Sequence, residues 1–416
     1  MVTTPTYLER FADRRLAELL AAFPAVMLNG PRAAGKTTTA RRHAVEVVRL
    51  DQPAQAGAFR ADPDAALRDR PEPILLDEWQ EVPGVLGAVK RSVDDDPRPG
   101  RFILTGSVRA EVEADLWPGT GRLIRLRMYG LTERELHASG PRSDQPTFLD
   151  RLLRTDPAEF ARPPVPLDLR DYVSLAVRGA FPAVAINPQR STFEWIDSYV
   201  EQLITRDSRQ IARLDELKLD RYFEVLAASS AGLPEHKTLY DAAGINRRTA
   251  DTYDALLEAL YITERVPAWS GNQLSTLTHT PKRYVIDSAL MAAALDASAE
   301  TVIADDDLLG RTLDTFVAAQ LRSEVAAFEG RTRVLHARTK GGREEVDLVI
   351  ERAGRRVFGL EIKATASPTR SDAKHLLWLR EKIGDRFAAG AVLHTGPDAF
   401  ELADRVLAVP ISAFWS

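Results

Sequence analysis

The first stretch suited to chemistry is the glycine-rich segment GPRAAGKTT, which begins at Gly30. It matches the pattern G-x-x-x-x-G-K-[ST], and it lies between an apolar strand and a helical stretch, as the pattern requires. In such a loop backbone N–H groups surround phosphates, the lysine reaches the β- and γ-phosphates, and the hydroxyl coordinates Mg²⁺. A ligand-free glycine-rich turn is the disfavoured alternative. The expected nucleotide contacts are Gly30, Pro31, Arg32, Ala33, Ala34, Gly35, Lys36, Thr37 and Thr38.

Two further apolar runs end in polar residues that could complete this site. In PILLDE we expect Asp77 to hold Mg²⁺ and Glu78 to polarise the water that attacks the γ-phosphate. The alternative is that both acids only cap the next helix. In RFILTGS we expect Thr105 and Ser107 to sense the γ-phosphate from a strand between the P-loop strand and the acidic strand. This combination favours hydrolysis over phosphotransfer to a small molecule.

A different set of charged residues lies in EEVDLVIERAGRRVFGLEIKAT, near the C-terminus. Side chains alternate between the faces of a strand, so Asp347, Glu361 and Lys363 are expected together on the face that is not buried. If the turn centres on Gly354, Asp347 lies opposite Glu361. Two carboxylates this close repel unless a cation lies between them, so we expect Mg²⁺ or Mn²⁺ there. Lys363 would orient a water or stabilise a phosphate.

An aspartate, a spacer and Glu-x-Lys on paired strands resemble the PD-(D/E)xK pattern of nucleases. The resemblance implies that Asp347, Glu361 and Lys363 are catalytic, and that the first helix adds an acidic metal ligand. Asp314 in GRTLDTF occupies that place, and Glu324 is a second candidate on the same helix. The alternative is a solvated strand face on which Lys363 pairs with both acids.

The segment KTLYDAAGINRRTADTYDALLEALYITERVPAW indicates a helix, a glycine-containing turn, a second helix and a strand. This order is typical of a helix-turn-helix with a wing, which often places its second helix in the DNA major groove. The expected nucleic-acid contacts are Arg247, Arg248, Thr249 and Thr252, at the start of that second helix. A role in packing or dimerisation remains the alternative.

The composition excludes several classes of protein. A chain of 416 residues exceeds what one core supports, so we expect two or three domains. The net charge of −5 confines any nucleic-acid contact to local basic patches. The absence of cysteine excludes disulfides and thiolate metal sites. No segment approaches the ~18 apolar residues of a membrane span, and the start of the chain has the pattern of an amphipathic helix. We therefore expect a cytoplasmic location and no membrane partner.

The order of the elements predicts an α/β protein with three parts. Strands alternate with helices over the first 140 or so residues, and proline-rich segments then suggest linkers. The expected parts are a P-loop ATPase domain over 1–145, a helical region over 165–300 with a winged helix at about 230–285, and an α/β domain over 301–416.

The ordered motifs GPRAAGKTT, LLDEWQEVP, ILTGS, GRLIRLRMYGLTERE, GAFP and YVEQLITRD resemble a family of prokaryotic AAA-type ATP-binding proteins, over nearly the whole chain. The C-terminal half of that family carries a domain of unknown function that is similar to restriction-endonuclease folds. The resemblance therefore implies an AAA-type ATPase domain followed by a nuclease-like domain. It also implies that Arg122 contacts nucleotide as a finger or sensor, although it could be a surface arginine. Arg206 and Asp207 would form an internal ion pair or a hinge.

Two functional hypotheses follow. The first is an ATP-hydrolysing AAA-type protein coupled to a nuclease-like domain that acts on DNA, with ATP and Mg²⁺ at one site and Mg²⁺ or Mn²⁺ at the other. The second is a regulatory switch ATPase whose C-terminal domain binds a partner protein and cuts nothing. Assembly into a homo-oligomer is compatible with both.

Overall fold

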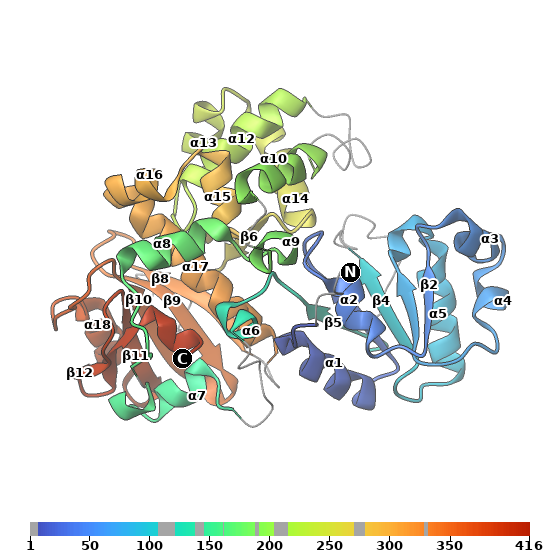
Figure 1. The fold of residues 1–416 in the computed structure, drawn as a ribbon, viewed down its shortest axis with the longest axis horizontal. Coiled ribbons are helices and arrows are strands. Elements are labelled where there is room, and N and C mark those ends of the chain that lie inside the picture. The colour runs from blue at the N-terminus through green and yellow to red at the C-terminus, as the bar shows by residue number, and fades with distance from the viewer. Residues whose placement is uncertain are drawn as a thin grey trace.

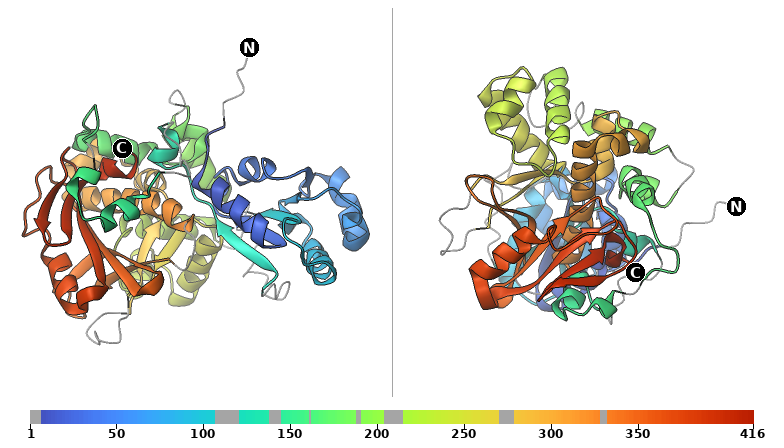
Figure 2. Two further views of the ribbon diagram at one scale, coloured as in Figure 1. Left: turned by 90° about the horizontal axis from the view of Figure 1, so that it is seen from below. Right: turned by 90° about the vertical axis from the view of Figure 1, so that its left-hand side faces the viewer.

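The computed structural model describes residues 7–106, 121–137, 145–160, 162–187, 191–203, 215–269, 279–327 and 332–416. Figures 1 and 2 show two sheet-containing bodies at opposite ends of the molecule, with the helical middle of the chain lying beside and between them. Within the described ranges, no helix is both long enough and apolar enough to cross a membrane.

The N-terminal body is built on a parallel sheet of order β2-β3-β4-β1-β5. Every residue of β1, β3 and β4 is buried, because helices cover both faces of these central strands. The edge strand β2 is partly exposed, with only Val48 buried. The strands are β1 (Ala25–Asn29), β2 (Glu46–Arg49), β3 (Ile74–Asp77), β4 (Phe102–Gly106) and β5 (Leu123–Arg127).

Two layers of helices enclose this sheet. One face packs against Leu16 and Leu19 of the first helix and Ala40 of the P-loop helix. The other face packs against Phe59 and Val89. The helices are α1 (Phe11–Ala22) and α2 (Lys36–Arg41) on the first face, and α3 (Pro53–Ala61), α4 (Pro63–Leu67) and α5 (Gly84–Asp95) on the second.

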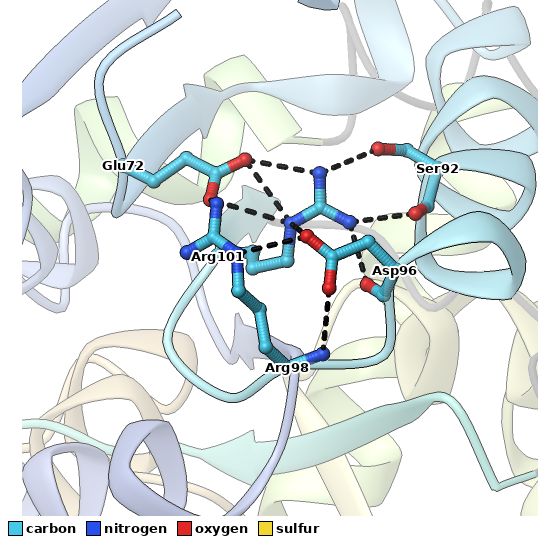
Figure 3. Close-up of polar contacts among 5 residues, drawn as sticks. All are labelled: Glu72, Ser92, Asp96, Arg98 and Arg101. Carbon is cyan, nitrogen blue, oxygen red and sulfur yellow. Dashed lines mark hydrogen bonds and ion pairs between the residues drawn. The ribbon is translucent and has the colours of Figure 1, made fainter.

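A buried arginine secures the end of this sheet that lies away from the P-loop. Arg101 precedes β4, and its guanidinium donates to the Glu72 carboxylate at 3.0 Å and to the Ser92 hydroxyl at 2.8 Å (Figure 3). It also donates to the carbonyl oxygen of Asp96 at 2.7 Å. Arg98 adds a further ion pair with Asp96. The cluster thus ties the end of α5 to the segments that lead into β3 and β4.

The middle of the chain contains two helices joined by a turn and followed by a strand, in the order that the sequence indicates. Gly244, with φ of 67°, makes the turn between these two helices, and the antiparallel strands β6 and β7 form the wing. Leu256 and Leu257 of the second helix are buried in the surrounding helical core. The elements are α8 (Leu169–Arg178), α9 (Pro182–Ala185), α10 (Thr192–Gln202), α12 (Glu216–Ala228), α13 (His236–Ala242), α14 (Arg247–Ala259), β6 (Thr263–Val266), β7 (Lys282–Val285), α15 (Ser288–Ala294) and α16 (Ala299–Ala304).

The C-terminal body has a six-stranded sheet of order β12-β13-β11-β10-β9-β8. The strands β8, β9 and β10 form an antiparallel meander, β11 and β13 continue it in parallel to β10, and β12 closes the edge. The long helix α17 packs on one face and α18 on the other. The elements are α17 (Asp306–Ala326), β8 (Arg333–Arg338), β9 (Glu345–Arg352), β10 (Arg356–Ile362), α18 (Lys374–Ile383), β11 (Phe387–His394), β12 (Phe400–Ala403) and β13 (Val406–Pro410).

Two segments outside this body complete its packing. Phe148 and Leu152, from the region expected to be a linker, are fully buried in its core, because they lie on helix α7 (Phe148–Leu153), which packs against it. Helix α6 (Glu133–Leu136) precedes α7 along the chain. The wing is attached to the edge strand β8: Trp269 N donates to His336 O at 2.7 Å, and His336 N donates to Pro267 O at 3.1 Å. The wing is therefore docked on the C-terminal sheet.

Candidate functional site

The P-loop follows β1 and requires glycine at two positions. A Cβ on Gly30, whose φ is 151°, would lie 2.0 Å from the carbonyl oxygen of Met128, and Gly35 has φ of 95°. Lys36 is turned back on the loop, where its Nζ donates to the carbonyl oxygens of Gly30 at 3.0 Å and Pro31 at 2.7 Å. Burial lowers the pKa of Lys36 to about 8, against the opposing effect of the nearby acids. The lysine is positioned to exchange these carbonyls for phosphate oxygens.

Asp77 accepts hydrogen bonds from two hydroxyl groups that belong to different elements. Its Oδ1 accepts from Thr37 Oγ1 at 2.7 Å and from Thr105 Oγ1 at 2.5 Å, and the carboxylate is 2% exposed. Thr105 reaches Asp77 because β4 lies between β1 and β3, as expected from the sequence. Asp77 therefore faces the P-loop instead of capping the next helix. Glu78 follows with φ of 54° and accepts from Gln80 Nε2.

The donor set at this point suits magnesium. A threonine hydroxyl and an aspartate oxygen are hard oxygen ligands of the kind that Mg²⁺ prefers. Thr37 and Asp77 lie within hydrogen-bond distance of each other, so one ion could contact both. Ser107, the other expected sensor, lies outside the described residues, as do Arg206 and Asp207.

Sequence reasoning missed a buried arginine behind the P-loop. Arg10, 4% exposed, donates from Nη1 to the carbonyl oxygen of Ala34 at 3.0 Å and pairs with Glu135 at 3.1 Å. Its other terminal nitrogen donates to the carbonyls of Tyr129 and Gly130. Arg10 therefore positions the loop from behind, although the motif itself gives no sign of it.

The expected contact of Arg122 with nucleotide is corrected by the strand directions. Arg122 immediately precedes β5, which runs parallel to β1 with Leu123 opposite Ala25. The P-loop follows the other end of β1. Arg122 and the nucleotide site of the same chain therefore lie at opposite ends of the parallel strands. Arg122 forms an ion pair with Asp94 of α5.

At the C-terminal site, the structure brings Asp314 and Asp347 together around a lysine that sequence reasoning did not include. Lys282 of β7 places its Nζ 3.2 Å from Asp347 Oδ1 and 3.5 Å from Asp314 Oδ2. Glu345 Oε1 lies 3.6 Å from the same nitrogen. We call Asp314, Glu345, Asp347 and Lys282 the acid cluster. Its other hydrogen bonds are Tyr284 Oη to Asp314 Oδ1 at 2.9 Å and Ile362 N to Asp347 Oδ2 at 3.1 Å.

The acids of this region differ in their electrostatics. Burial raises the pKa of Asp314 to about 6, opposed by Lys282. Burial acts on Asp347 as well, but the positive charges of Lys282 and Lys363 outweigh it and lower the pKa of Asp347. Burial, reinforced by the charge of Asp347, holds the pKa of Glu361 well above its usual range. Glu361 is 2% exposed, and its Oε2 accepts from Lys363 Nζ at 3.1 Å.

The hairpin pairs as predicted as far as Leu360 opposite Leu348. Regular alternation then breaks around Asp347, because the β8–β9 register shifts and Val346 packs beneath α18 together with Val349. Asp347 is directed at Lys282, which also contacts Asp314 of α17. The charged residues therefore sit between packed layers instead of on a solvated strand face.

This arrangement does not fit a resident metal ion. Among the residues that the structure describes, no group of three His, Cys, Asp or Glu side chains is placed to hold a metal. The predicted ligand set of Asp314, Asp347 and Glu361 is therefore not formed: Lys282 occupies the space between the two aspartates, and Glu361 pairs with Lys363.

The second candidate acid on the helix, Glu324, is placed elsewhere. It lies ten residues beyond Asp314, or about 15 Å along α17. There it accepts a hydrogen bond from Leu149 N at 3.4 Å and lies 3.9 Å from Arg134. Its role is therefore to join α17 to α6 and α7.

The expected nucleic-acid surface begins α14. Arg247 and Arg248 are exposed there, and Arg247 lies 3.9 Å from Asp251 on the next turn. Thr249 N donates to the capping Asn246 side chain at 2.9 Å, and Thr252 Oγ1 donates to Arg248 O at 3.1 Å. The two arginines are thus accessible. Both threonine hydroxyls already donate hydrogen bonds within the helix and its cap.

A charged group links the three parts of the chain. Glu264 of β6 accepts from Arg127 of β5 at 2.6 Å and pairs with Arg322 of α17 at 3.3 Å. Arg127 stands opposite Asn29, the residue before the P-loop. Arg322 also lies over the ring of Tyr284, 4.7 Å from its centroid. We call Glu264, Arg127 and Arg322 the interdomain triad; it connects the P-loop strand pair to the acid cluster through the wing.

Three family models match successive parts of the chain. Residues 22–137 match the family described as AAA domain, residues 169–301 match a domain of unknown function, DUF8612, and residues 309–414 match another, DUF4143. The last two descriptions state no activity.

Similar proteins extend over most of the chain. The uncharacterized protein Mb2031c of Mycobacterium bovis is 28% identical over 410 residues, which cover 96% of this chain and 83% of the relative. The uncharacterized protein Rv2008c of Mycobacterium tuberculosis gives the same values. Among solved structures, the Walker-type ATPase PABY2304 of Pyrococcus abyssi aligns with a TM-score of 0.42 at 13% identity, over 69% of this chain and 96% of that one. On the family match and the P-loop geometry, residues 22–137 form an AAA-type ATPase domain.

Proposed function

We propose that the protein is an ATP-hydrolysing switch in which the AAA-type domain controls the C-terminal domain. The observation that carries this proposal is the meeting of Thr37, Asp77 and Thr105 beside the P-loop lysine, Lys36. These residues come from three separate elements, and a structural turn would not need them together. Glu78 follows Asp77 directly at the same end of the sheet.

Each residue has a defined task in this proposal. Lys36 leaves the carbonyls of the loop and contacts the β- and γ-phosphates, and Thr37 and Asp77 hold Mg²⁺. The bound ion supplies charge stabilisation for the phosphates. Glu78 accepts hydrogen bonds from the attacking water and orients it. Thr105 donates to Asp77 and thereby senses whether that carboxylate holds the ion.

Replacement of the glutamate tests the hydrolytic role. We expect Glu78→Gln to bind a fluorescent ATP analogue as the wild type does and to lose turnover by about 10²-fold or more. Lys36→Ala should lose binding itself. Glu81→Gln, three residues away and exposed, is the matched control. Turnover by Glu78→Gln equal to that of the control, or turnover that requires a phosphate acceptor, would contradict the proposal.

For the C-terminal domain we favour binding of a partner protein over cleavage. Its order of one helix, an antiparallel three-stranded meander, a second helix and a parallel strand supports the resemblance to a restriction-endonuclease-like core. The acid cluster, however, holds Lys282 where such a core would place a metal ion. Mg²⁺- or Mn²⁺-dependent cleavage of DNA by the wild type, lost in Lys363→Ala, would reverse this preference.

DNA binding is the second candidate function. It is supported by the exposed Arg247 and Arg248 at the start of α14, where a recognition helix contacts bases and phosphates. The docked wing argues for a packing role instead, because its backbone is already bonded to β8. Binding to duplex DNA at low salt separates the two.

A further inference from the structure

Lys282 is the most buried charge of the acid cluster. The side chain comes from the wing, is 1% exposed, and lies within 3.6 Å of carboxylate oxygens from Asp314, Glu345 and Asp347. Its ammonium donates hydrogen bonds to Asp347 and Asp314, and Glu345 adds a third negative charge at ion-pair distance. These three acids come from α17 and β9, which belong to the C-terminal body.

The hairpin that carries Lys282 is fixed at several points. Tyr284, two residues after Lys282 on β7, donates a hydrogen bond from its hydroxyl group to Asp314. Beyond the other strand of the hairpin, Trp269 is 2% exposed in the core beneath β9 and β10, and it bonds to the backbone of His336. Lys282 therefore cannot leave the acids unless the hairpin separates from both α17 and β8.

The lysine and a metal ion exclude each other at this place. A magnesium or calcium ion lies roughly 2.0–2.6 Å from its oxygen ligands. Lys282 Nζ is already 3.2 Å from Asp347 Oδ1, and the other oxygen of Asp347 accepts from the backbone of Ile362. A divalent cation on Asp347 would stand next to a buried ammonium with little water to screen the repulsion.

We propose that Lys282 is the resident cation of the acid cluster, and that the β6–β7 hairpin thereby closes the cluster to divalent metal ions. The ion pairs of Lys282 then also hold the wing on the C-terminal body. This explains how the acids gathered from β9 and α17 are neutralised, and it does not depend on ATP hydrolysis.

Mn²⁺ binding by nucleotide-free protein tests the proposal, since without nucleotide the ATP site contributes little. Binding is measured by electron paramagnetic resonance of free Mn²⁺ and by the shift of the melting temperature. We expect the wild type and Lys282→Arg to show the same weak binding. Lys282→Met should bind Mn²⁺ at least about tenfold more tightly, a gain of about 1.4 kcal/mol. Addition of Asp347→Asn to Lys282→Met should abolish the gain, and Lys237→Met, a change at an exposed lysine, should leave binding unchanged.

Other results would overturn the proposal. Binding by the wild type that Asp347→Asn removes would show that Lys282 does not exclude the ion. Folded Lys282→Met without a gain in affinity would show that the acids are not a cation site. If Lys282→Met unfolds, Mn²⁺ in the refolding buffer should restore the fold, because the ion replaces the missing charge. Failure of Mn²⁺ to restore it would count against the proposal in the same way.

Discussion

The interdomain triad offers a direct test of how the parts of the chain are joined. Glu264→Gln removes one negative charge while keeping the size and shape of the side chain. The change leaves Arg127 and Arg322 without their shared carboxylate. We expect the protein to fold but to melt at a clearly lower temperature.

The expected loss comes mainly from one arginine. The Arg127 side chain is 32% exposed, so water can replace most of its lost contact, at a cost below about 1 kcal/mol. Arg322 is 3% exposed, and within the described part of the chain none of its nitrogens makes a hydrogen bond. Removing the partner of such a buried charge costs about 3–5 kcal/mol. At about 2–4 °C per kcal/mol, we expect the melting temperature to fall by roughly 6–20 °C.

Differential scanning calorimetry on the full chain measures this effect. Glu258→Gln is the matched control, because its partner Arg265 is 43% exposed and the pair should contribute less than about 1 kcal/mol. Adding Arg322→Met to Glu264→Gln should recover part of the loss, since no buried charge then remains unpaired. Equal melting temperatures for Glu264→Gln and Glu258→Gln would refute the reasoning.

Three further predictions concern other parts of the chain. Arg101→Met should lower the melting temperature by roughly 4 °C or more by calorimetry, because loss of a buried ion pair with Glu72 costs about 2–4 kcal/mol; an unchanged value would contradict this. Burial lowers the pKa of His394 to about 4. The unfolded chain therefore takes up the proton first, and stability should fall by about 2 kcal/mol as the pH drops from 7 to 5. His394→Gln should remove this contribution in urea titrations, while His336, whose pKa burial also lowers to about 4, keeps its own. If α14 binds DNA, Arg247→Ala with Arg248→Ala should reduce the salt slope of binding by about 2, and an unchanged slope would exclude these contacts.

The nucleotide site could be predicted from the sequence because its parts are local or ordered along the chain. The P-loop is one continuous motif, and Asp77 and Thr105 each end an apolar strand, so parallel pairing brings them to one edge. Arg122 is expected at the nucleotide site but is not found there. It precedes β5 and therefore lies at the end of the sheet away from the P-loop. Arg10 could not be foreseen, since a buried arginine outside the motif carries no pattern of its own.

The C-terminal hairpin shows where alternation along a strand stops being informative. Alternation predicts that Asp347 and Glu361 lie opposite each other, but the observed pairing runs only as far as Leu360 opposite Leu348, and the β8–β9 register shifts just beyond it. The strand pattern could not show this shift, nor that Lys282 of another element would meet Asp347. The prediction of an open charged face is therefore wrong for Glu361, which is 2% exposed and pairs with Lys363.

Lys282 explains why a set of acids at nuclease-like spacing does not by itself indicate a metal site. A buried group of carboxylates must be neutralised, but the neutralising charge can come from an ion or from a lysine of another element. The spacing of Asp347 and Glu361 is the same in both cases. In this chain the lysine lies on β7, about 65 residues before Asp347, in a segment whose pattern predicts only the wing of a helix-turn-helix. Since the wing supplies the cation, any movement that undocks the wing also changes the charge of the acid cluster. The interdomain triad joins that same hairpin to β5, the neighbour of the P-loop strand.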